Sequence, residues 1–118
     1  MVVKDPIGGS LHDQEVERRY KRAANRLPDG YWDEVHKEQV YFEDTVDPRE
    51  TLPPKGNTVG EFDLLHVNYE DKVMMYEEVK TSESDLDHAQ EQLERAKDHF
   101  EDTEWTVITS SVLAERKQ

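Results

Sequence analysis

The sequence contains no cysteine, which excludes disulfide bonds, thiolate metal sites and a cysteine nucleophile. It also lacks any run of about 18 apolar residues, so no membrane-spanning helix is expected. The N-terminal stretch MVVKDPIGGS has no long apolar core of the kind found in signal peptides, and we therefore expect a cytoplasmic, intracellular protein. The phosphate-binding pattern G-x-x-x-x-G-K is missing as well, so no nucleotide cofactor is expected.

Negative charge dominates the composition. Apolar residues make up 34% of the 118 residues, charged residues make up 36%, and the net charge is -13. Because acidic residues are spread along most of the chain, we interpret the composition as an adaptation to molar salt, where the Debye length falls to about 3 Å. This favours a halophilic source. The exception is a basic segment over residues 15–26, which contains two glutamates and five cationic residues, Arg18, Arg19, Lys21, Arg22 and Arg26.

Two helices are predicted from apolar side chains that recur with the period of an α-helix. The first covers residues 13–27, and the second begins at Ser84, which forms an S-x-x-D capping box with Asp87. Their apolar faces comprise Val16, Tyr20, Ala23 and Leu27 in the first helix and Leu86, Ala89, Leu93, Ala96 and Phe100 in the second. Residues 1–11 are expected to form a loose N-terminal arm and residues 114–118 a polar tail.

Four strands are predicted, over residues 34–42, 59–67, 72–80 and 105–113. The first could also be a short helix that runs into a strand, and a long Pro-rich loop follows it. The last strand is β-branched and mostly uncharged, which is typical of a strand buried on both faces. This order predicts an α/β fold with one domain over residues 1–118, in which helices flank a central mixed four-stranded sheet.

Charged side chains gather on the predicted hairpin formed by the second and third strands. Since side chains alternate along a strand, Glu61 and Asp63 share a face with Glu78 and Lys80, whereas Glu77 lies on the other face. A turn centred between residues 69 and 70 would place Glu61 opposite Glu78. Carboxylates that face one another across strands are destabilising unless a cation neutralises them, and Mg²⁺ prefers such oxygen ligands. The alternative is a surface ion pair between Glu61 and Lys80.

The segment GEFDLL is followed by EVK, whose glutamate lies fifteen residues after Asp63. Together with the order of elements over residues 13–113, this pattern resembles the PD-(D/E)XK nuclease superfamily and is similar to archaeal Holliday-junction resolvases and small restriction-type endonucleases. The resemblance implies that Asp63, Glu78 and the backbone carbonyl of Val79 bind Mg²⁺ or Mn²⁺ and that Lys80 is catalytic.

The resemblance also implies a glutamate on the first helix that closes the site. Glu17 fits this position best, with Glu15 as the alternative, and Glu61 would be an outer carboxylate or a ligand to a second metal. Some relatives carry a glutamine on the helix after the lysine, for which Gln90 and Gln92 are the candidates. The tyrosine that accompanies it in those relatives is missing here, which departs from their exonuclease branch.

We therefore expect a Mg²⁺-dependent deoxyribonuclease, an endonuclease that hydrolyses DNA phosphodiester bonds in repair or recombination, with junction or branched DNA as a substrate class. A homodimer is expected because a small chain covers little DNA and symmetric junctions suit two-fold enzymes. DNA contacts are expected from five cations, against the alternative of a solvated helix face: Arg18, Arg19, Lys21, Arg22 and Lys55. The alternative function is a non-catalytic binding protein with a nuclease fold, or an acidic DNA mimic that acts as an inhibitor.

Overall fold

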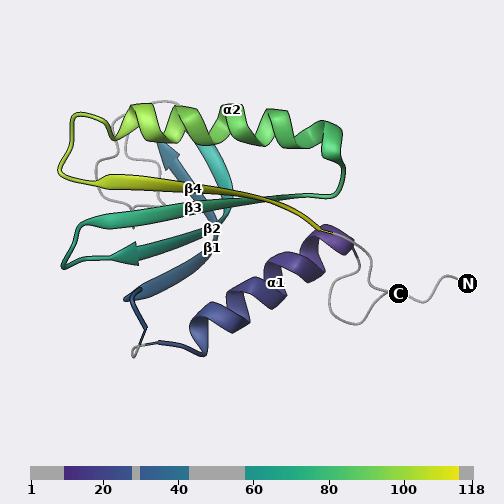
Figure 1. Cartoon of the computed structure of the whole chain (residues 1–118), viewed down its shortest axis with the longest axis horizontal. Coiled ribbons are helices and arrows are strands. Elements are labelled where there is room, and N and C mark those ends of the chain that lie inside the picture. Colours follow the sequence, from purple (N-terminus) through teal and green to yellow (C-terminus); the bar gives the residue numbers. More distant parts are fainter. Residues whose placement is uncertain (1–9, 28–29, 43–57, 115–118) are drawn as a thin grey trace, which may run out of the picture.

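Two helices and four strands follow one another in the predicted order (Figure 1). The computed structural model describes residues 10–27, 30–42 and 58–114. The elements are α1 (Leu11–Ala24), β1 (Glu34–Phe42), β2 (Thr58–Asn68), β3 (Val73–Lys80), α2 (Glu83–His99) and β4 (Thr106–Leu113). The α/β fold and the mixed four-stranded sheet are confirmed.

The sheet has the strand order β1-β2-β3-β4. The first three strands pair in antiparallel fashion, and β4 pairs in parallel with β3 because α2 carries the chain back across the sheet. Leu64 lies opposite Glu77 and Leu65 opposite Tyr76. The predicted register, with Glu61 opposite Glu78, is therefore wrong by two residues, since the turn extends to Lys72, which has a positive φ of 55°. A shift of two residues preserves the predicted alternation between the two strands, so Asp63 and Glu78 stay on a common side, whereas Phe62 departs from strict alternation and packs in the same buried cluster as Leu65.

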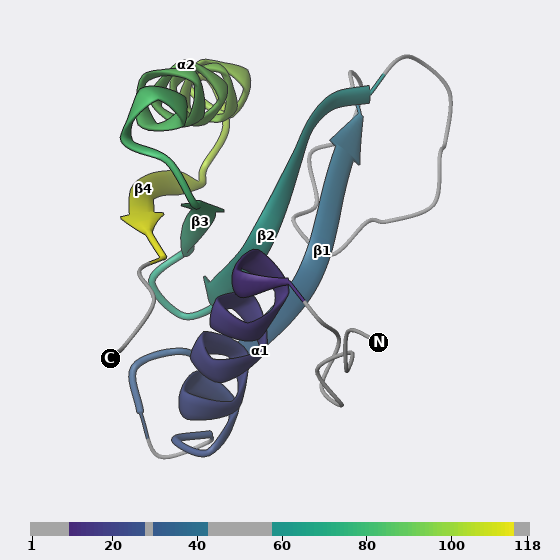
Figure 2. The ribbon, with the colours of Figure 1, turned by 90° about the vertical axis from the view of Figure 1, so that its right-hand side faces the viewer.

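The two helices cover opposite faces of the sheet, and each face has its own apolar cluster. On one face α1 packs against Val35, Leu64 and Val79. On the other face α2 contributes a stripe to a cluster of buried residues that comprises Phe62, Leu65, Val67, Met74, Tyr76, Leu93, Ala96, Phe100 and Val107. Figure 2 shows α1 and α2 on either side of the strands. Both predicted helical stripes are thus confirmed as core-facing, although Leu86 remains partly exposed.

The helix starts differ from the prediction. Ser10 is the N-cap of α1, and its Oγ accepts a hydrogen bond of 2.9 Å from the Asp13 backbone N–H. Residues 10 and 11 therefore belong to the cap and the helix rather than to a loose arm. The N-cap of α2 is Ser82, which makes no side-chain capping bond, so the predicted capping box of Ser84 and Asp87 is not formed. Instead, the Ser84 hydroxyl shares a hydrogen bond of 2.7 Å with that of Ser82.

β4 lies at the edge of the sheet, and the prediction that both of its faces are buried is wrong. α1 packs against the other three strands, so that Ile108 on this face of β4 is 44% exposed while Val107 on the α2 face is buried. Ala114 is buried and its N–H donates to the Lys80 carbonyl at 2.7 Å, so the polar tail begins after Ala114. Within the described ranges, neither helix has the length and apolar character needed to cross a membrane.

The core beneath α2 depends on Leu93, which is fully buried. We expect Leu93→Ala to lower the free energy of unfolding by about 2–5 kcal/mol, because the substitution removes buried methyl groups and leaves a cavity. The measurement is urea denaturation followed by circular dichroism. The exposed neighbour Glu91 provides the control, and Glu91→Ala should change the stability by less than about 0.5 kcal/mol. Equal stabilities of the two variants would contradict the packing of α2.

Candidate functional site

A cavity of about 340 Å³ opens where β2 and β3 separate. The pairing of these strands ends at Leu64 and Glu77, and in Figure 2 β1 and β2 extend as a ribbon past the end of β3. The cavity is lined by residues of α1, β1, β2, β3 and α2: His12, Glu38, Val40, Glu61, Phe62, Asp63, Glu78, Lys80 and Gln92. The four charged residues that were predicted to share a face of the hairpin therefore meet in one cavity.

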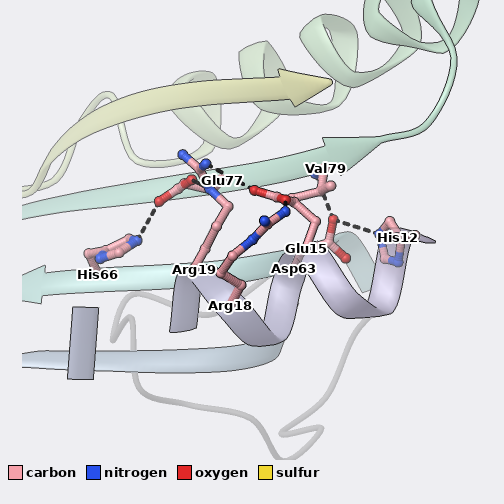
Figure 3. A network of polar contacts seen from close by, with 8 residues as sticks. All are labelled: His12, Glu15, Arg18, Arg19, Asp63, His66, Glu77 and Val79. Carbon is pink, nitrogen blue, oxygen red and sulfur yellow. Dashed lines mark hydrogen bonds and ion pairs between the residues drawn. The ribbon is translucent and has the colours of Figure 1, made fainter. Parts of the chain in front are cut away.

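Asp63 is held at the centre of this group by two contacts of the same oxygen. Its Oδ2 accepts a hydrogen bond of 2.7 Å from the Val79 backbone N–H and lies 3.1 Å from His12 Nε2 (Figure 3). In a strand the N–H and C=O of one residue point toward the same neighbouring strand. The Val79 carbonyl is thus directed to the side on which Asp63 lies, where the ladder between β2 and β3 has already ended.

The carboxyl groups of Asp63 and Glu78 are close enough to form a hydrogen bond. Burial raises the pKa of Glu78 to about 8, with further contributions from its hydrogen bond to Asp63 and from the negative charge of that residue. Lys80 acts in the opposite direction, because its Nζ lies 3.9 Å from Glu78 Oε2. Two neighbouring carboxyl groups repel each other when both are ionised, so positive charge is favoured beside them.

This donor set suits a hard divalent cation. Asp63 and Glu78 offer carboxylate oxygens, Val79 offers a carbonyl, and Mg²⁺ is commonly held by one or two carboxylates while it keeps several waters. Glu61 lies exposed at the rim. Among residues 10–27, 30–42 and 58–114, no group of three or more His, Asp or Glu side chains is arranged to hold a metal. The protein would therefore contribute two carboxylates and leave the remaining positions open.

The α1 residue that reaches Asp63 is His12, which the sequence analysis missed. Partial burial lowers the pKa of His12, but hydrogen bonds to Asp13 and Asp63 outweigh this effect and the pKa is raised. Glu17, the preferred helix carboxylate, is instead bound by Lys37 Nζ at 2.7 Å and does not line the cavity. The capping pattern of Ser10 and Asp13 is the signal that would have placed His12 in the first helical turn.

The two candidate glutamines on α2 have different surroundings. Gln92 lines the cavity, and its Oε1 is buried without a hydrogen-bond partner in the described part of the chain. Gln90 is exposed, and its Nε2 donates to Glu94 Oε1 at 3.2 Å. A buried acceptor with no partner costs free energy, so the Gln92 carbonyl is available to a ligand or a water in the cavity. Gln92 is therefore the glutamine that retains a candidate role.

Glu77 points to the opposite face of β3 and lies in a buried network (Figure 3). Its Oε1 is 2.7 Å from His66 Nε2, and its Oε2 accepts a hydrogen bond of 2.9 Å from Arg19 Nε. Arg19 also contacts Glu15, which is buried as well. Burial alone would raise the pKa of Glu77, but the hydrogen bonds from His66 and Arg19 outweigh it and lower the pKa. Glu78, and not Glu77, is therefore the glutamate beside Asp63, as predicted.

The predicted DNA-contact cations fall into three groups. Arg18 and Arg19 are both bound by Glu15, and Lys21 Nζ lies 3.9 Å from Glu17, so these cations are compensated within the chain. Arg22 is exposed and forms no ion pair with the described residues. Lys55 lies outside the described residues. The positive charge that remains available on α1 is thus smaller than the sequence indicated.

No family model, curated protein or solved structure matches the chain. The chemistry of the cavity therefore follows from its own residues. A carboxylate pair, an adjacent ammonium group and an unpartnered amide oxygen can hold a cation and stabilise negative charge that develops on a bound substrate. Such an arrangement is suited to transfer reactions at phosphate.

The adjacent glutamates of β3 predict opposite dependences of stability on pH. The native pKa of Glu78 is about 8 and its ordinary pKa is 4.5, so the native state retains a proton that the unfolded state has lost. Between these values stability falls as the pH rises, because the unfolded state has released the proton that the native state keeps. We expect this decline in the wild type, measured by urea denaturation in EDTA, and expect Glu78→Gln to remove it.

Glu77→Gln is the matched control for this prediction. The pKa of Glu77 is lowered in the native state, so its contribution to stability is present above the ordinary pKa of 4.5 and is lost as the pH falls. Glu77→Gln should therefore destabilise the protein at neutral pH and keep the decline toward alkaline pH. An identical decline in the wild type and in Glu78→Gln would contradict the raised pKa of Glu78.

Proposed function

We propose that the protein is a divalent-metal-dependent deoxyribonuclease of the PD-(D/E)XK type that hydrolyses phosphodiester bonds of DNA inside the cell. The observation that carries the proposal is that Asp63, Glu78 and Lys80 line one cavity, in which burial and the neighbouring Asp63 raise the pKa of Glu78 to about 8. Buried carboxylates with a strongly raised pKa in a cavity are typical of functional sites. A purely structural pair would instead be compensated, as Glu77 is by Arg19 and His66.

The residues of the cavity would have different roles in the reaction. Asp63, Glu78 and the carbonyl of Val79 would hold Mg²⁺ or Mn²⁺. A divalent cation held there would supply Lewis-acid chemistry, by which a bound water would ionise more readily and charge on a phosphoryl oxygen would be stabilised. The Lys80 ammonium would stabilise negative charge on the phosphate, and the Val79 N–H and His12 fix the orientation of the Asp63 carboxylate.

The charge of the chain decides how DNA would be held. The net charge of -13 repels DNA, and Arg18 and Arg19 are already engaged by Glu15 and Glu77. Screening by salt weakens this repulsion, but salt also weakens contacts between cations and phosphates. Affinity for substrate would therefore depend mainly on a divalent cation held by the carboxylates, and we expect binding to be weak in EDTA.

Cleavage assays test the proposal directly. Plasmid, duplex and four-way-junction DNA are incubated with the protein and Mg²⁺ or Mn²⁺ over a series of KCl concentrations. We expect Asp63→Asn and Lys80→Ala to lower the rate of cleavage by at least about 100-fold, because each removes charge stabilisation in the transition state. Asp102→Asn changes an exposed carboxylate outside the cavity and should leave the rate unchanged.

Cleavage that persists in both site variants would indicate a contaminating nuclease. If the folded wild type cuts none of these substrates with either metal, the proposal is overturned in favour of a DNA-binding protein without catalytic activity.

Metal binding has a readout that does not depend on cleavage. A cation that binds only the native state, and is present at a concentration of about 100 times its Kd, adds about 2.7 kcal/mol to the free energy of unfolding. We expect Mn²⁺ to raise the melting temperature of the wild type, and to raise it more at alkaline than at acidic pH, because the proton on Glu78 competes with the metal. Calorimetric melting curves at several pH values measure this response.

Asp63→Asn and Glu78→Gln should abolish the response to Mn²⁺, whereas Lys80→Ala should retain it because Lys80 carries no metal-binding oxygen. An equal rise in all four proteins would show that the cation binds elsewhere on the acidic surface.

A further inference from the structure

A second cavity, of about 410 Å³, lies on the other face of β3, between the C-terminal half of α1 and the sheet. We call it the α1 cavity. Its walls include Arg22, Arg26, Tyr31, Trp32, His66 and Met75. Its volume falls within the range of about 300–1,000 Å³ that is usual for small-ligand pockets. None of these residues takes part in the site around Asp63.

The α1 cavity carries positive charge that the protein leaves uncompensated. Arg22 and Arg26 are exposed and form no ion pair with any described residue, whereas Arg19 at the floor of the cavity is bound by Glu77 and Glu15. In a chain with a net charge of -13, carboxylates are abundant, yet none of the described ones pairs with these two arginines. Guanidinium groups bind phosphate through paired, charge-assisted hydrogen bonds.

One wall of the α1 cavity is aromatic and held in place. The Trp32 ring meets Tyr31 edge to face at 4.8 Å and lies 5.5 Å from the His66 ring. The Tyr31 hydroxyl donates to Asp71 Oδ2 at 2.8 Å, which anchors a ring that is otherwise 49% exposed. Aromatic side chains of this kind form stacking surfaces for nucleobases. An exposed aromatic surface beside free guanidinium groups favours a ligand that is both planar and anionic.

His66 adds a hydrogen-bonding group to this cavity. Its Nε2 lies 2.7 Å from Glu77 Oε1, a contact in which the ring N–H donates a hydrogen bond to the carboxylate. When the ring carries its proton on Nε2, Nδ1 is an acceptor. His66 Nδ1 is buried and has no hydrogen-bond partner among the described residues. An amino group of a ligand could satisfy it.

We infer that the α1 cavity binds a single nucleotide, with the base against Trp32 and Tyr31 and the phosphate on Arg22 and Arg26. The nucleotide is either a free mononucleotide or an unpaired nucleotide of a DNA strand. With a rise of 1.5 Å per residue, Arg22 lies about 15 Å along α1 from His12, so a strand that follows the helix would reach both cavities within a few nucleotides. Binding here requires neither a cation nor cleavage, and so goes beyond the proposed nuclease activity.

Tryptophan fluorescence provides the test, because Trp105 packs against Tyr69 outside the α1 cavity. In Trp105→Phe, the remaining Trp32 reports binding of deoxyadenosine monophosphate in EDTA. We expect saturable quenching by this nucleotide, with much weaker effects of deoxyadenosine and of inorganic phosphate. Calorimetric titration of the unmodified protein gives the same affinity without a substitution.

The double variant Arg22→Ala/Arg26→Ala should weaken this binding by roughly tenfold or more, since it removes two charge-assisted contacts. Arg95→Ala is the matched control, because Arg95 is exposed on α2 and lies outside the cavity. Asp63→Asn should bind the nucleotide normally, which separates this inference from the proposed nuclease activity.

Two DNA competitors distinguish the sources of the nucleotide. One competitor is a duplex with one unpaired nucleotide, and the other is a fully paired duplex of equal length. If only the first displaces the mononucleotide, the ligand is a nucleotide of a DNA strand. Displacement by neither identifies the free mononucleotide. The inference is overturned if the unmodified protein binds no mononucleotide, or if the double variant binds it as tightly as Arg95→Ala does.

Discussion

The ion pair between Arg19 of α1 and Glu77 of β3 ties the first helix to the centre of the sheet. Glu77 is buried and Arg19 is partly buried, and removing the arginine would leave a buried charge without its partner, which commonly costs about 3–5 kcal/mol. The position of α1 that this contact sets also brings His12 to Asp63 at one end of the helix and Arg22 to the second cavity at the other. One buried interaction thus positions residues in two separate cavities.

Strand alternation predicted the most important distinction in the site. Of two neighbouring glutamates, Glu78 shares a face with Lys80 and Glu77 does not, because side chains alternate along one strand. Which of the two shares a side with Asp63 is unchanged by any register shift of an even number of residues. The error of two residues in the pairing therefore left Asp63 and Glu78 together. The helical stripes were equally predictable, because a 3.6-residue period needs no knowledge of the partner that a helix packs against.

Other features depend on contacts that are distant in sequence. In the basic segment of α1, Arg18 and Lys21 are compensated locally by Glu15 and Glu17. Arg19 also binds Glu77, which lies 58 residues away on another element and could not be anticipated from the segment itself. Glu17 fitted the expected spacing on the helix, yet its orientation toward Lys37 is decided by how α1 lies on β1. β4 was misjudged because an uncharged β-branched run has the same appearance at the centre of a sheet and at its edge. His12 was the exception, since its helical position was signalled locally by Ser10 and Asp13.

The exposed edge of β4 links the fold to the acidic composition. Proteins usually keep such edges from pairing with other chains by placing charged residues, prolines or β-bulges on them. The eight residues of β4, TVITSSVL, include no charged residue, no proline and no glycine. In dilute buffer, electrostatic repulsion between molecules of charge -13 can keep these edges apart instead. At about 1 M salt the Debye length is only about 3 Å and this protection is lost. Ionic strength thereby becomes the variable that determines whether two copies of the sheet can approach each other edge to edge.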